Sequence, residues 1–253
     1  LNYVEYGKEN KYDDNIFFQK YSQMSRSQQG LAGAGEWETL RKLLPDFKDK
    51  RVLDLGCGYG WHCIYAMEHG ASSVVGVDIS HKMLEVAKEK THFPQVEYKC
   101  CAIEDVEFPE ESFDVILSSL AFHYVADYEI LVKKIYRILK SGGKLVFTVE
   151  HPVFTAYGTQ DWYYNEKGEI LHFPVDNYYY EGKRTAMFLE EKVTKYHRTL
   201  TTYLNTLLSN GFIINHIVEP QPPEYMMDIP GMQDEMRRPM MLIVSANKNC
   251  YTT

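Results

Sequence analysis

The residues of this sequence that could do chemistry are concentrated in a glycine-rich segment near residue 56. Gly56, Gly58 and Gly60 alternate with other residues directly after an apolar run that includes Asp54. Such a run is typical of a strand that is covered on both faces of a parallel sheet. The glycines carry no Cβ, so a ligand can approach their backbone closely. The segment therefore predicts a ligand-binding turn at the end of a buried strand.

The residues around the turn separate three classes of ligand. A phosphate-binding loop would continue with Lys and Ser or Thr, but Trp61 and His62 follow Gly60. The dinucleotide-binding pattern would have a third glycine where Trp61 stands, which counts against that ligand without excluding it. Asp54 would repel a pyrophosphate and attract a cation. We therefore favour a cationic ligand and keep a nicotinamide dinucleotide as the alternative.

A second carboxylate follows the turn. Asp78 comes after the apolar stretch 73–77, at the spacing of about 20 residues at which a strand–helix–strand unit places an acid against a ribose. Both hydroxyls of a ribose can donate to one carboxylate. The alternative role, a cap of the next helix, is weaker because Ser80 is better placed for it. Asp78 is thus a predicted ribose-binding residue.

The segment Asp54-Leu55-Gly56-Cys57-Gly58-Tyr59-Gly60 resembles the first motif of class I S-adenosylmethionine-dependent methyltransferases. The cofactor of that family carries a sulfonium and an amino group and no phosphate. The resemblance implies S-adenosylmethionine as cofactor and a small-molecule methyl acceptor. The residues that it implies for cofactor binding are Asp54, Gly56, Cys57, Gly58, Asp78, Ile79, Met83, Ala102, Ile103, Glu104, Ser118, Leu120 and His123.

Within that set the resemblance also implies which part of the cofactor some residues contact. Met83 is expected beside the adenine. The family usually has Asp where this chain has Ala102, so the backbone of Ile103 and the side chain of Glu104 are the expected contacts with the base. Residues 120–124 resemble a stretch whose backbone lies beside the methionine part, which puts His123 near the cofactor.

Three histidines are candidates for a catalytic base. Methyl transfer from a sulfonium is an in-line displacement, so positioning can supply most of the rate, and a base is needed only if the accepting atom keeps its proton. His123 lies after the fourth predicted strand, His151 after the fifth, and His197 near the end of the aromatic-rich segment 151–198. For each of them a structural role is an equally good interpretation.

Strand and helix patterns alternate five times between residues 51 and 149. Strands are predicted over 51–54, 73–77, 95–101, within 110–119 and over 144–149, with helices over 61–70, 80–90 and 127–139 between them. This alternation predicts a parallel, doubly wound sheet. A helix over 199–210 and strands over 212–218 and 240–246 follow. The methyltransferase resemblance implies a seven-stranded, Rossmann-like α/β sheet with an antiparallel final strand.

The chain divides into four predicted parts. Residues 1–50 form a helical extension whose aromatics include Tyr3, Tyr6 and Tyr12, and which could fold back as a lid or simply pack on the surface. Residues 51–150 form the cofactor-binding core, and residues 199–253 complete the sheet. Residues 151–198 are rich in aromatics without helical period, which predicts a cap of short strands over the site or, alternatively, a homodimer interface.

Composition argues against several function classes. The 253-residue chain has a formal net charge of −8 and five cysteines without framework spacing. No apolar run approaches the ~18 residues of a membrane span. These features predict a cytoplasmic protein with no nucleic-acid partner, no membrane partner and no metal site. No basic start followed by an apolar stretch is seen, so a secretory signal is not expected.

Three functions are compatible with these observations. The first is a methyltransferase that acts on a small molecule. The second is a nicotinamide-dependent oxidoreductase, in which Asp78 would again hold a ribose but Trp61 is unfavourable. The third is a non-catalytic protein that binds S-adenosylmethionine. After the fourth strand Ser118-Ser119-Leu120-Ala121 stands in place of the Asp/Asn-Pro-Pro-Tyr/Phe that amino-methylating enzymes of nucleic-acid bases would show.

Overall fold

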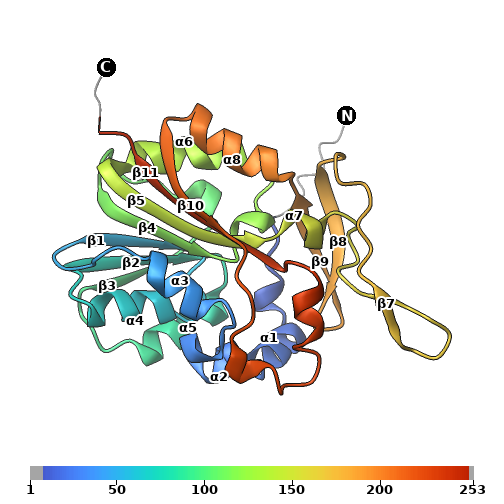
Figure 1. The fold of residues 1–253 in the computed structure, drawn as a ribbon. Coiled ribbons are helices and arrows are strands. Elements are labelled where there is room, and N and C mark those ends of the chain that lie inside the picture. The colour runs from blue at the N-terminus through green and yellow to red at the C-terminus, as the bar shows by residue number, and fades with distance from the viewer. Residues whose placement is uncertain (1–7, 251–253) are drawn as a thin grey trace, which may run out of the picture.

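The protein is built around one seven-stranded sheet, shown in Figure 1. The computed structural model describes residues 8–250, so the predicted aromatics Tyr3 and Tyr6 lie outside the described residues. The strand order is β10-β11-β5-β4-β1-β2-β3. The strands are β1 (Arg51–Leu55), β2 (Ser73–Asp78), β3 (Val96–Cys100), β4 (Phe113–Ser119), β5 (Leu139–Glu150), β10 (Phe212–Val218) and β11 (Met241–Lys248).

The predicted fold class is confirmed. Strands β1 to β5 pair in parallel, and β11 pairs antiparallel with both β5 and β10. The reversed final strand therefore lies inside the sheet, with β10 at the edge. Parallel strands joined by helices bring all their carboxyl ends to one edge of the sheet, where ligands of such folds bind.

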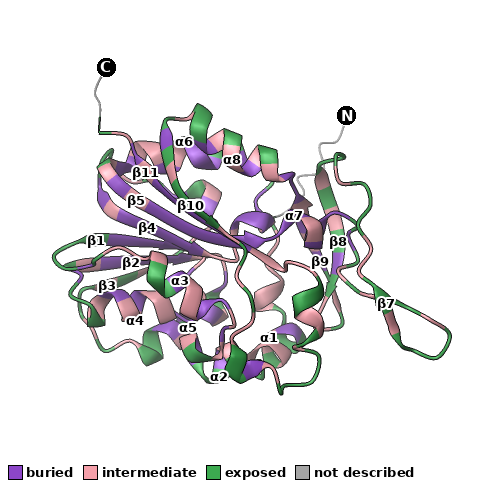
Figure 2. Cartoon of the chain, in the orientation of Figure 1, coloured by how far each residue is buried: buried purple, intermediate pink, exposed green. Residues whose placement is uncertain are grey.

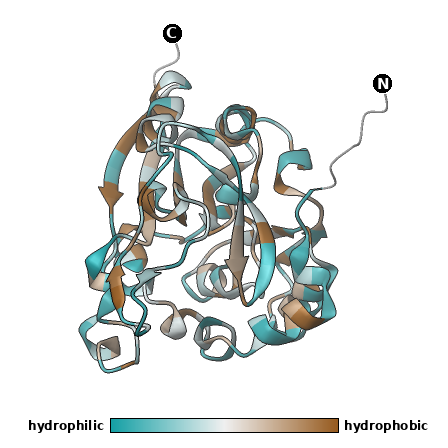
Figure 3. Cartoon of the chain, turned by 90° about the vertical axis from the view of Figure 1, so that its right-hand side faces the viewer, coloured by the Kyte–Doolittle hydropathy of each residue, from teal (hydrophilic) through white to brown (hydrophobic). Residues whose placement is uncertain are grey.

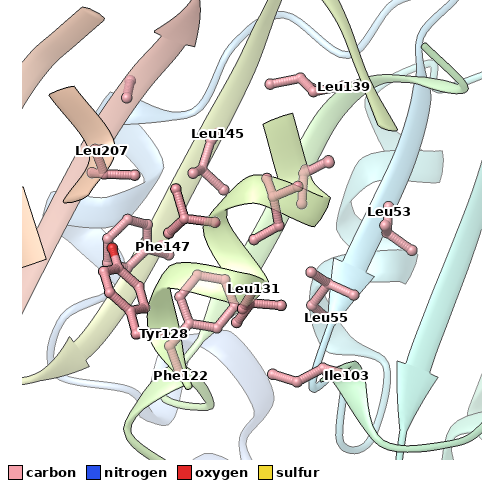
Figure 4. Close-up of a cluster of buried hydrophobic side chains, with 14 of the residues drawn as sticks. Leu53, Leu55, Ile103, Phe122, Tyr128, Leu131, Leu139, Leu145, Phe147 and Leu207 are labelled. Atoms are coloured by element: carbon pink, nitrogen blue, oxygen red, sulfur yellow. The ribbon is translucent and has the colours of Figure 1, made fainter. Parts of the chain in front are cut away.

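Helices cover both faces of the sheet (Figure 1). On one face α3 (Trp37–Leu43), α4 (Trp61–Glu68) and α5 (His81–Lys90) pack against Val52, Val74 and Leu117. On the other face lie α6 (Tyr128–Ile138) and α8 (Leu200–Ser209), whose Leu131 and Leu207 meet Leu53, Leu145 and Phe147 (Figure 4). Side chains of a strand alternate between its two faces. Because helices cover both faces of the sheet, the central strands are buried on both sides (Figure 2).

Local sequence signals set the ends of these helices. The side chains of Ser80, Asp127 and Thr199 accept hydrogen bonds from backbone N–H groups in the first turns of α5, α6 and α8. The start of β5 is different from the prediction, which placed it at Lys144. Leu139 already pairs with Phe113 of β4, and a register shift absorbs the turn that includes Gly142. Pairing with β4 thus extends β5 through Gly142 and Gly143, which predicted a turn.

The N-terminal extension folds back over the carboxyl edge of the sheet. It contains η1 (Lys11–Asp13), α1 (Asn15–Ser22), α2 (Ser25–Gln28) and η2 (Gly30–Gly33). The Asp13 carboxylate accepts hydrogen bonds from the Ser80 hydroxyl at 2.6 Å and from the Lys82 N–H at 3.2 Å. The extension is therefore fastened to the N-terminus of α5, beside the end of β2.

The segment 151–198 forms α7 (Pro152–Thr155) and two hairpins, β6 (Tyr163–Tyr164) with β7 (Ile170–His172), and β8 (Gly182–Phe188) with β9 (Glu191–His197). The hairpin β8–β9 stands beside the N-terminal extension, whereas β7 projects away from the body (Figure 1). Seen from that side, hydrophobic and hydrophilic residues are interspersed (Figure 3).

Four 3-10 helices of the described chain lie in the remaining connections, the longest of which is residues 219–240 between β10 and β11. They are η3 (Ile103–Asp105), η4 (Phe122–Tyr124), η5 (Glu224–Met226) and η6 (Asp234–Arg237). Within residues 8–250 no helix is long and apolar enough to span a membrane.

Candidate active site

A cavity of about 210 Å³ opens at the carboxyl ends of β1 to β5. Its walls come from the turns after these strands, from the N-terminal extension, from the end of β8 and from the start of β11. Ten of the residues expected to bind the cofactor line it, namely Gly56, Gly58, Asp78, Ile79, Met83, Ala102, Ile103, Glu104, Leu120 and His123. The parallel sheet thus brings together residues that are spread over some 70 positions of sequence.

The glycine turn is shaped by packing as well as by the cavity. Gly56, Gly58 and Gly60 all have positive φ angles, which side chains disfavour. A Cβ on Gly56 would lie 2.4 Å from the Cβ of Ala121, and one on Gly60 would lie 2.2 Å from the Tyr98 hydroxyl. At Gly58 the nearest atom is the Met83 methyl, at 3.2 Å. The fold itself therefore requires Gly56 and Gly60, and Gly58 keeps the cavity wall open.

The Asp78 carboxylate is fixed beside this turn. One oxygen accepts a hydrogen bond from the Gly58 N–H and the other from the Ser80 N–H, each at 2.9 Å. Burial raises the pKa of the Asp78 carboxyl, while these hydrogen bonds work in the opposite direction. Each oxygen retains capacity for a further hydrogen bond. The carboxylate is thus held in place to accept from two neighbouring hydroxyl groups in the cavity.

Three residues expected to bind the cofactor lie outside the lining of this cavity. Asp54 is buried behind the turn, where one oxygen accepts from the Cys63 thiol at 3.5 Å and the other has no partner among the described residues. Burial raises the pKa of Asp54 to about 7. Ser118 donates to the Leu55 carbonyl at 2.7 Å, because its side chain points to the opposite face from that of Ser119. Cys57 lines a smaller neighbouring cavity.

His123 is the candidate base that lines the cavity. It is buried, and its Nδ1 accepts a hydrogen bond from the Glu150 N–H at 3.3 Å, so the ring proton sits on Nε2. Burial lowers the pKa of His123 to about 4. At neutral pH this ring is therefore uncharged and presents an N–H donor rather than a free basic nitrogen.

The other two candidate bases, His151 and His197, do not line the cavity. The His151 Nδ1 accepts from the Val153 N–H at the start of α7, and its Nε2 lies 2.8 Å from the Glu219 carboxylate. The His197 ring bonds the Thr155 hydroxyl at 2.7 Å and the Tyr178 carbonyl at 2.8 Å. The His197 ring thus uses both nitrogens to hold the segment after β5, whereas the His151 Nε2 makes no hydrogen bond within the described residues despite its 2.8 Å distance from Glu219.

Several lining residues were not singled out from the sequence. Tyr12, Tyr21 and Arg26 come from the N-terminal extension. The Tyr12 hydroxyl lies 3.2 Å from that of Tyr124, and the rings of Tyr12 and Tyr21 meet edge to face at 5.2 Å. Only the aromatic density of residues 1–50 pointed to this wall, because contacts across more than 100 residues leave no local pattern.

Arg26 connects the main cavity to the smaller one, of about 80 Å³, on the other side of the glycine turn. Its guanidinium bonds both oxygens of the buried Glu36 carboxylate, at 3.0 and 3.2 Å. A guanidinium is suited to bind a carboxylate through paired N–H groups. Arg26 thus offers a site for an anionic group beyond Gly58.

Glu150, the last residue of β5, forms part of the opposite wall. Its carboxylate accepts from the Lys195 ammonium and from the Gln160 amide, each at 2.5 Å. Burial alone would raise the pKa of Glu150, but the nearby His123 ring, the Lys195 charge and these hydrogen bonds outweigh it and lower the pKa. The carboxylate is therefore ionised at neutral pH. Within residues 8–250 no cluster of three or more His, Cys, Asp or Glu side chains could hold a metal ion.

Known proteins resemble this chain over most of its length. A family model described as a methyltransferase domain matches residues 53–147. A Listeria monocytogenes protein assigned as an S-adenosylmethionine-dependent methyltransferase is 58% identical, with a TM-score of 0.83 over 87% of this chain and 99% of that structure. This chain belongs to the family of S-adenosylmethionine-dependent methyltransferases. The family expected from the glycine turn is thereby confirmed.

A second solved relative supports membership of this methyltransferase family, and an uncharacterized protein is similar to the chain over nearly all its length. An S-adenosylmethionine-dependent methyltransferase of Mesorhizobium loti is 41% identical, with a TM-score of 0.80 over 86% of this chain and all of that structure. An uncharacterized protein of Haemophilus influenzae is 34% identical over 94% of this chain and 96% of its own length. S-adenosylmethionine, the expected cofactor, is the one that defines this family. Membership of the family therefore favours the methyltransferase hypothesis over the oxidoreductase alternative.

Proposed function

We propose that this protein transfers the methyl group of S-adenosylmethionine to a small-molecule acceptor bound in the cavity of about 210 Å³. The observation that carries the proposal is the Asp78 carboxylate, which is held by the Gly58 and Ser80 N–H groups with free acceptor capacity toward the cavity. A carboxylate in this position of a strand–helix–strand unit suits a ribose with two free hydroxyls.

The residues around Asp78 fit the remaining parts of this cofactor. Ala102, Ile103 and Met83 provide apolar surface on the side of β3 that suits an adenine ring. Arg26 lies on the other side of the glycine turn, where its guanidinium suits the carboxylate of the amino-acid part. The Tyr12 and Tyr21 rings suit a positive charge between these ends. When bound, S-adenosylmethionine would supply an electrophilic methyl group on a sulfonium.

The rest of the cavity is available for the acceptor. Its walls are the Tyr124 and Phe188 rings, the side chains of Met240 and Met241, and the polar pair His123 and Glu150. We assign His123 the role of a hydrogen-bond donor to the acceptor, because its proton sits on Nε2. Catalytic roles for His151 and His197 stay predictions of the sequence, without support from their contacts.

Other aspects of function belong to the same proposal. They are a cytoplasmic location, a small-molecule partner and no nucleic-acid or membrane partner; the net charge of −8 argues against a nucleic-acid partner. The described cysteines are all free thiols, as is usual in a reducing compartment.

Formation of S-adenosylhomocysteine tests the proposed function. The purified protein is incubated with S-adenosylmethionine and a protein-free extract of small molecules from the source organism, and the product is measured by mass spectrometry. We expect production that depends on both the extract and the active protein. Binding of S-adenosylhomocysteine without any turnover would instead support the non-catalytic hypothesis. Failure to bind it would refute the proposal.

A further inference from the structure

A buried ionised group lines the cavity and is not among the residues that the proposed function assigns to the cofactor. Glu150 is 8% exposed and lines the cavity at the end of β5. Burying a carboxylate costs free energy unless it is paired and hydrogen-bonded. The family model ends at residue 147, so Glu150 lies outside the part that this chain shares with methyltransferase domains in general.

The segment 151–198 holds this carboxylate in place. The Lys195 ammonium, on β9, lies 2.5 Å from one oxygen of Glu150, and the Gln160 amide donates to the other at 2.5 Å. The same ammonium donates to the Gln160 carbonyl oxygen at 2.8 Å, which closes a ring of three side chains. Each carboxylate oxygen can accept about two hydrogen bonds. One position on each oxygen therefore remains for a further donor.

The charges around the cavity disfavour an acidic acceptor. The lining includes the carboxylates of Glu9, Asp78, Glu104 and Glu150, and the cations Lys8 and Arg26. Lys8 is already paired with Asp105, and Arg26, which is paired with Glu36, is assigned above to the carboxylate of the cofactor. An anion placed beside Glu150 would meet this carboxylate at low dielectric, because the Lys195 ammonium that pairs with it is not among the residues that line the cavity.

The walls near Glu150 favour a different kind of ligand. The rings of Tyr124 and Phe188 and the side chains of Met240 and Met241 line the same cavity as Glu150. The Lys195 ammonium already lies over both rings, 5.8 and 5.2 Å from their centroids. Aromatic rings and thioethers bind apolar groups, so these walls favour an acceptor with apolar parts.

We propose that the Glu150 carboxylate binds an N–H or O–H group of the methyl acceptor, and that this acceptor is an uncharged or cationic molecule rather than an acid. This inference rests on the proposed function. Glu150 is in this account a specificity-determining residue, and Lys195 and Gln160 are positioning residues that fix the direction of its free lone pairs.

The charge of the acceptor can be tested with the wild-type protein. The small-molecule extract is separated by ion exchange at neutral pH before the reaction, because methylation itself can change the charge of an acceptor. Each fraction is then incubated with protein and S-adenosylmethionine that carries a labelled methyl group. We expect label to be incorporated in the unretained or cation-exchange fractions. Incorporation only in the fraction retained by the anion exchanger would overturn the inference.

The role of Glu150 is tested with Glu150→Gln, which keeps the shape and removes the charge. We expect the rate of label incorporation from the active fraction to fall at least ten-fold, with the half-saturating amount of that fraction raised, while S-adenosylhomocysteine affinity stays within two-fold. Glu129→Gln, a change of an exposed carboxylate on α6, is the matched control and leaves both quantities unchanged.

Three results would contradict this role. Unchanged transfer by Glu150→Gln would show that the carboxylate does not bind the acceptor. Equal losses of transfer, S-adenosylhomocysteine binding and melting temperature would show that Glu150 only holds the segment 151–198 on β5. A wild-type protein that binds S-adenosylhomocysteine and labels no fraction would refute the proposed function, and this inference with it.

Discussion

Asp54 and Asp78, which are 24 residues apart, differ in how their carboxyl groups are hydrogen-bonded and in whether they face the cavity. Asp78 accepts two backbone N–H groups and faces the cavity. Asp54 lies behind the glycine turn, with one oxygen unpartnered among the described residues. From the sequence, both were predicted to bind the cofactor. The difference arises from how the turn packs on α4 and β2, which the spacing of residues does not encode.

Asp54→Asn should remove a pH-dependent loss of stability. The pKa of Asp54 is raised by burial from 3.8 to about 7, so the folded state binds more protons than the unfolded state between these values. The wild-type protein therefore loses stability as the pH rises from about 4 to 7. We expect the stability gain of Asp54→Asn to be about 2 kcal/mol larger at pH 7.5 than at pH 5. Denaturant unfolding measures both values, and a gain that does not change with pH would contradict this assignment.

Arg26→Gln should weaken only ligands that carry the amino-acid part of the cofactor. If Arg26 binds the cofactor carboxylate, affinity for S-adenosylhomocysteine falls about ten-fold or more, while affinity for 5′-methylthioadenosine, which lacks the carboxylate, is unchanged. Titration calorimetry measures the four affinities. Arg41→Gln, on the outer side of α3 and paired with Glu38, is the control. Equal losses for both ligands would show that Arg26 only supports the fold through Glu36.

At the scale of elements, the sequence predicted the core well and the lining of the site in part. The strands and helices between residues 51 and 150 follow from apolar runs and caps such as Ser80 and Asp127. Contributions from the N-terminal extension, such as Tyr12 and Arg26, were not predictable because they depend on contacts between distant segments. For the same reason, the spacing of residues could not predict that His123 lines the cavity whereas His197 makes structural contacts.

The extension and the hairpin β8–β9 close the cavity together. Lys20 lies 2.8 Å from the Glu190 carboxylate, the Thr194 N–H donates to Glu9 at 2.8 Å, and the rings of Phe17 and Phe188 are in contact at 5.6 Å. Both elements line the cavity that Asp78 faces, through residues such as Tyr12 and Phe188. The lid predicted for residues 1–50 remains a proposal, and these contacts support it.

Hydrogen exchange should detect this lid. We expect S-adenosylhomocysteine to slow the exchange of backbone amides in residues 12–28, because Tyr12, Tyr21 and Arg26 contact the ligand only when the lid is closed. Amides of the edge strand β10, far from the cavity lining, serve as the internal reference. An N-terminal extension whose exchange is unaffected by a saturating ligand would contradict the role of a lid.

At the scale of the whole molecule, the part that matches the methyltransferase family model supplies only some of the cavity walls. The family model covers residues 53–147, and the walls proposed for the acceptor include residues outside it such as Glu150, Phe188 and Met240. This division explains why the cofactor followed from the sequence and the acceptor did not.

The segment 151–198 has one part beside the cavity and another that is exposed on the surface. Phe188 and Lys195 belong to the part beside the cavity, whereas Tyr163, Tyr179 and Tyr180 are exposed by 57%, 88% and 76%. The homodimer predicted as an alternative role of this segment would use these exposed rings. Light scattering after size-exclusion chromatography should then give the mass of two chains, and the double change Tyr179→Ser with Tyr180→Ser should give one. A wild-type monomer would leave the cap as the role of the segment.

Calorimetric titration of Asp78→Asn with S-adenosylhomocysteine tests the central claim most directly. The account predicts that the wild-type protein binds S-adenosylhomocysteine more tightly than NAD. It also predicts that the variant loses about ten- to hundred-fold in affinity for S-adenosylhomocysteine, because hydrogen bonds from the ribose to a charged carboxylate are lost, while Glu129→Gln binds like the wild type. Equal affinity of the variant and the wild type for S-adenosylhomocysteine, or stronger binding of NAD by the wild type, would contradict it.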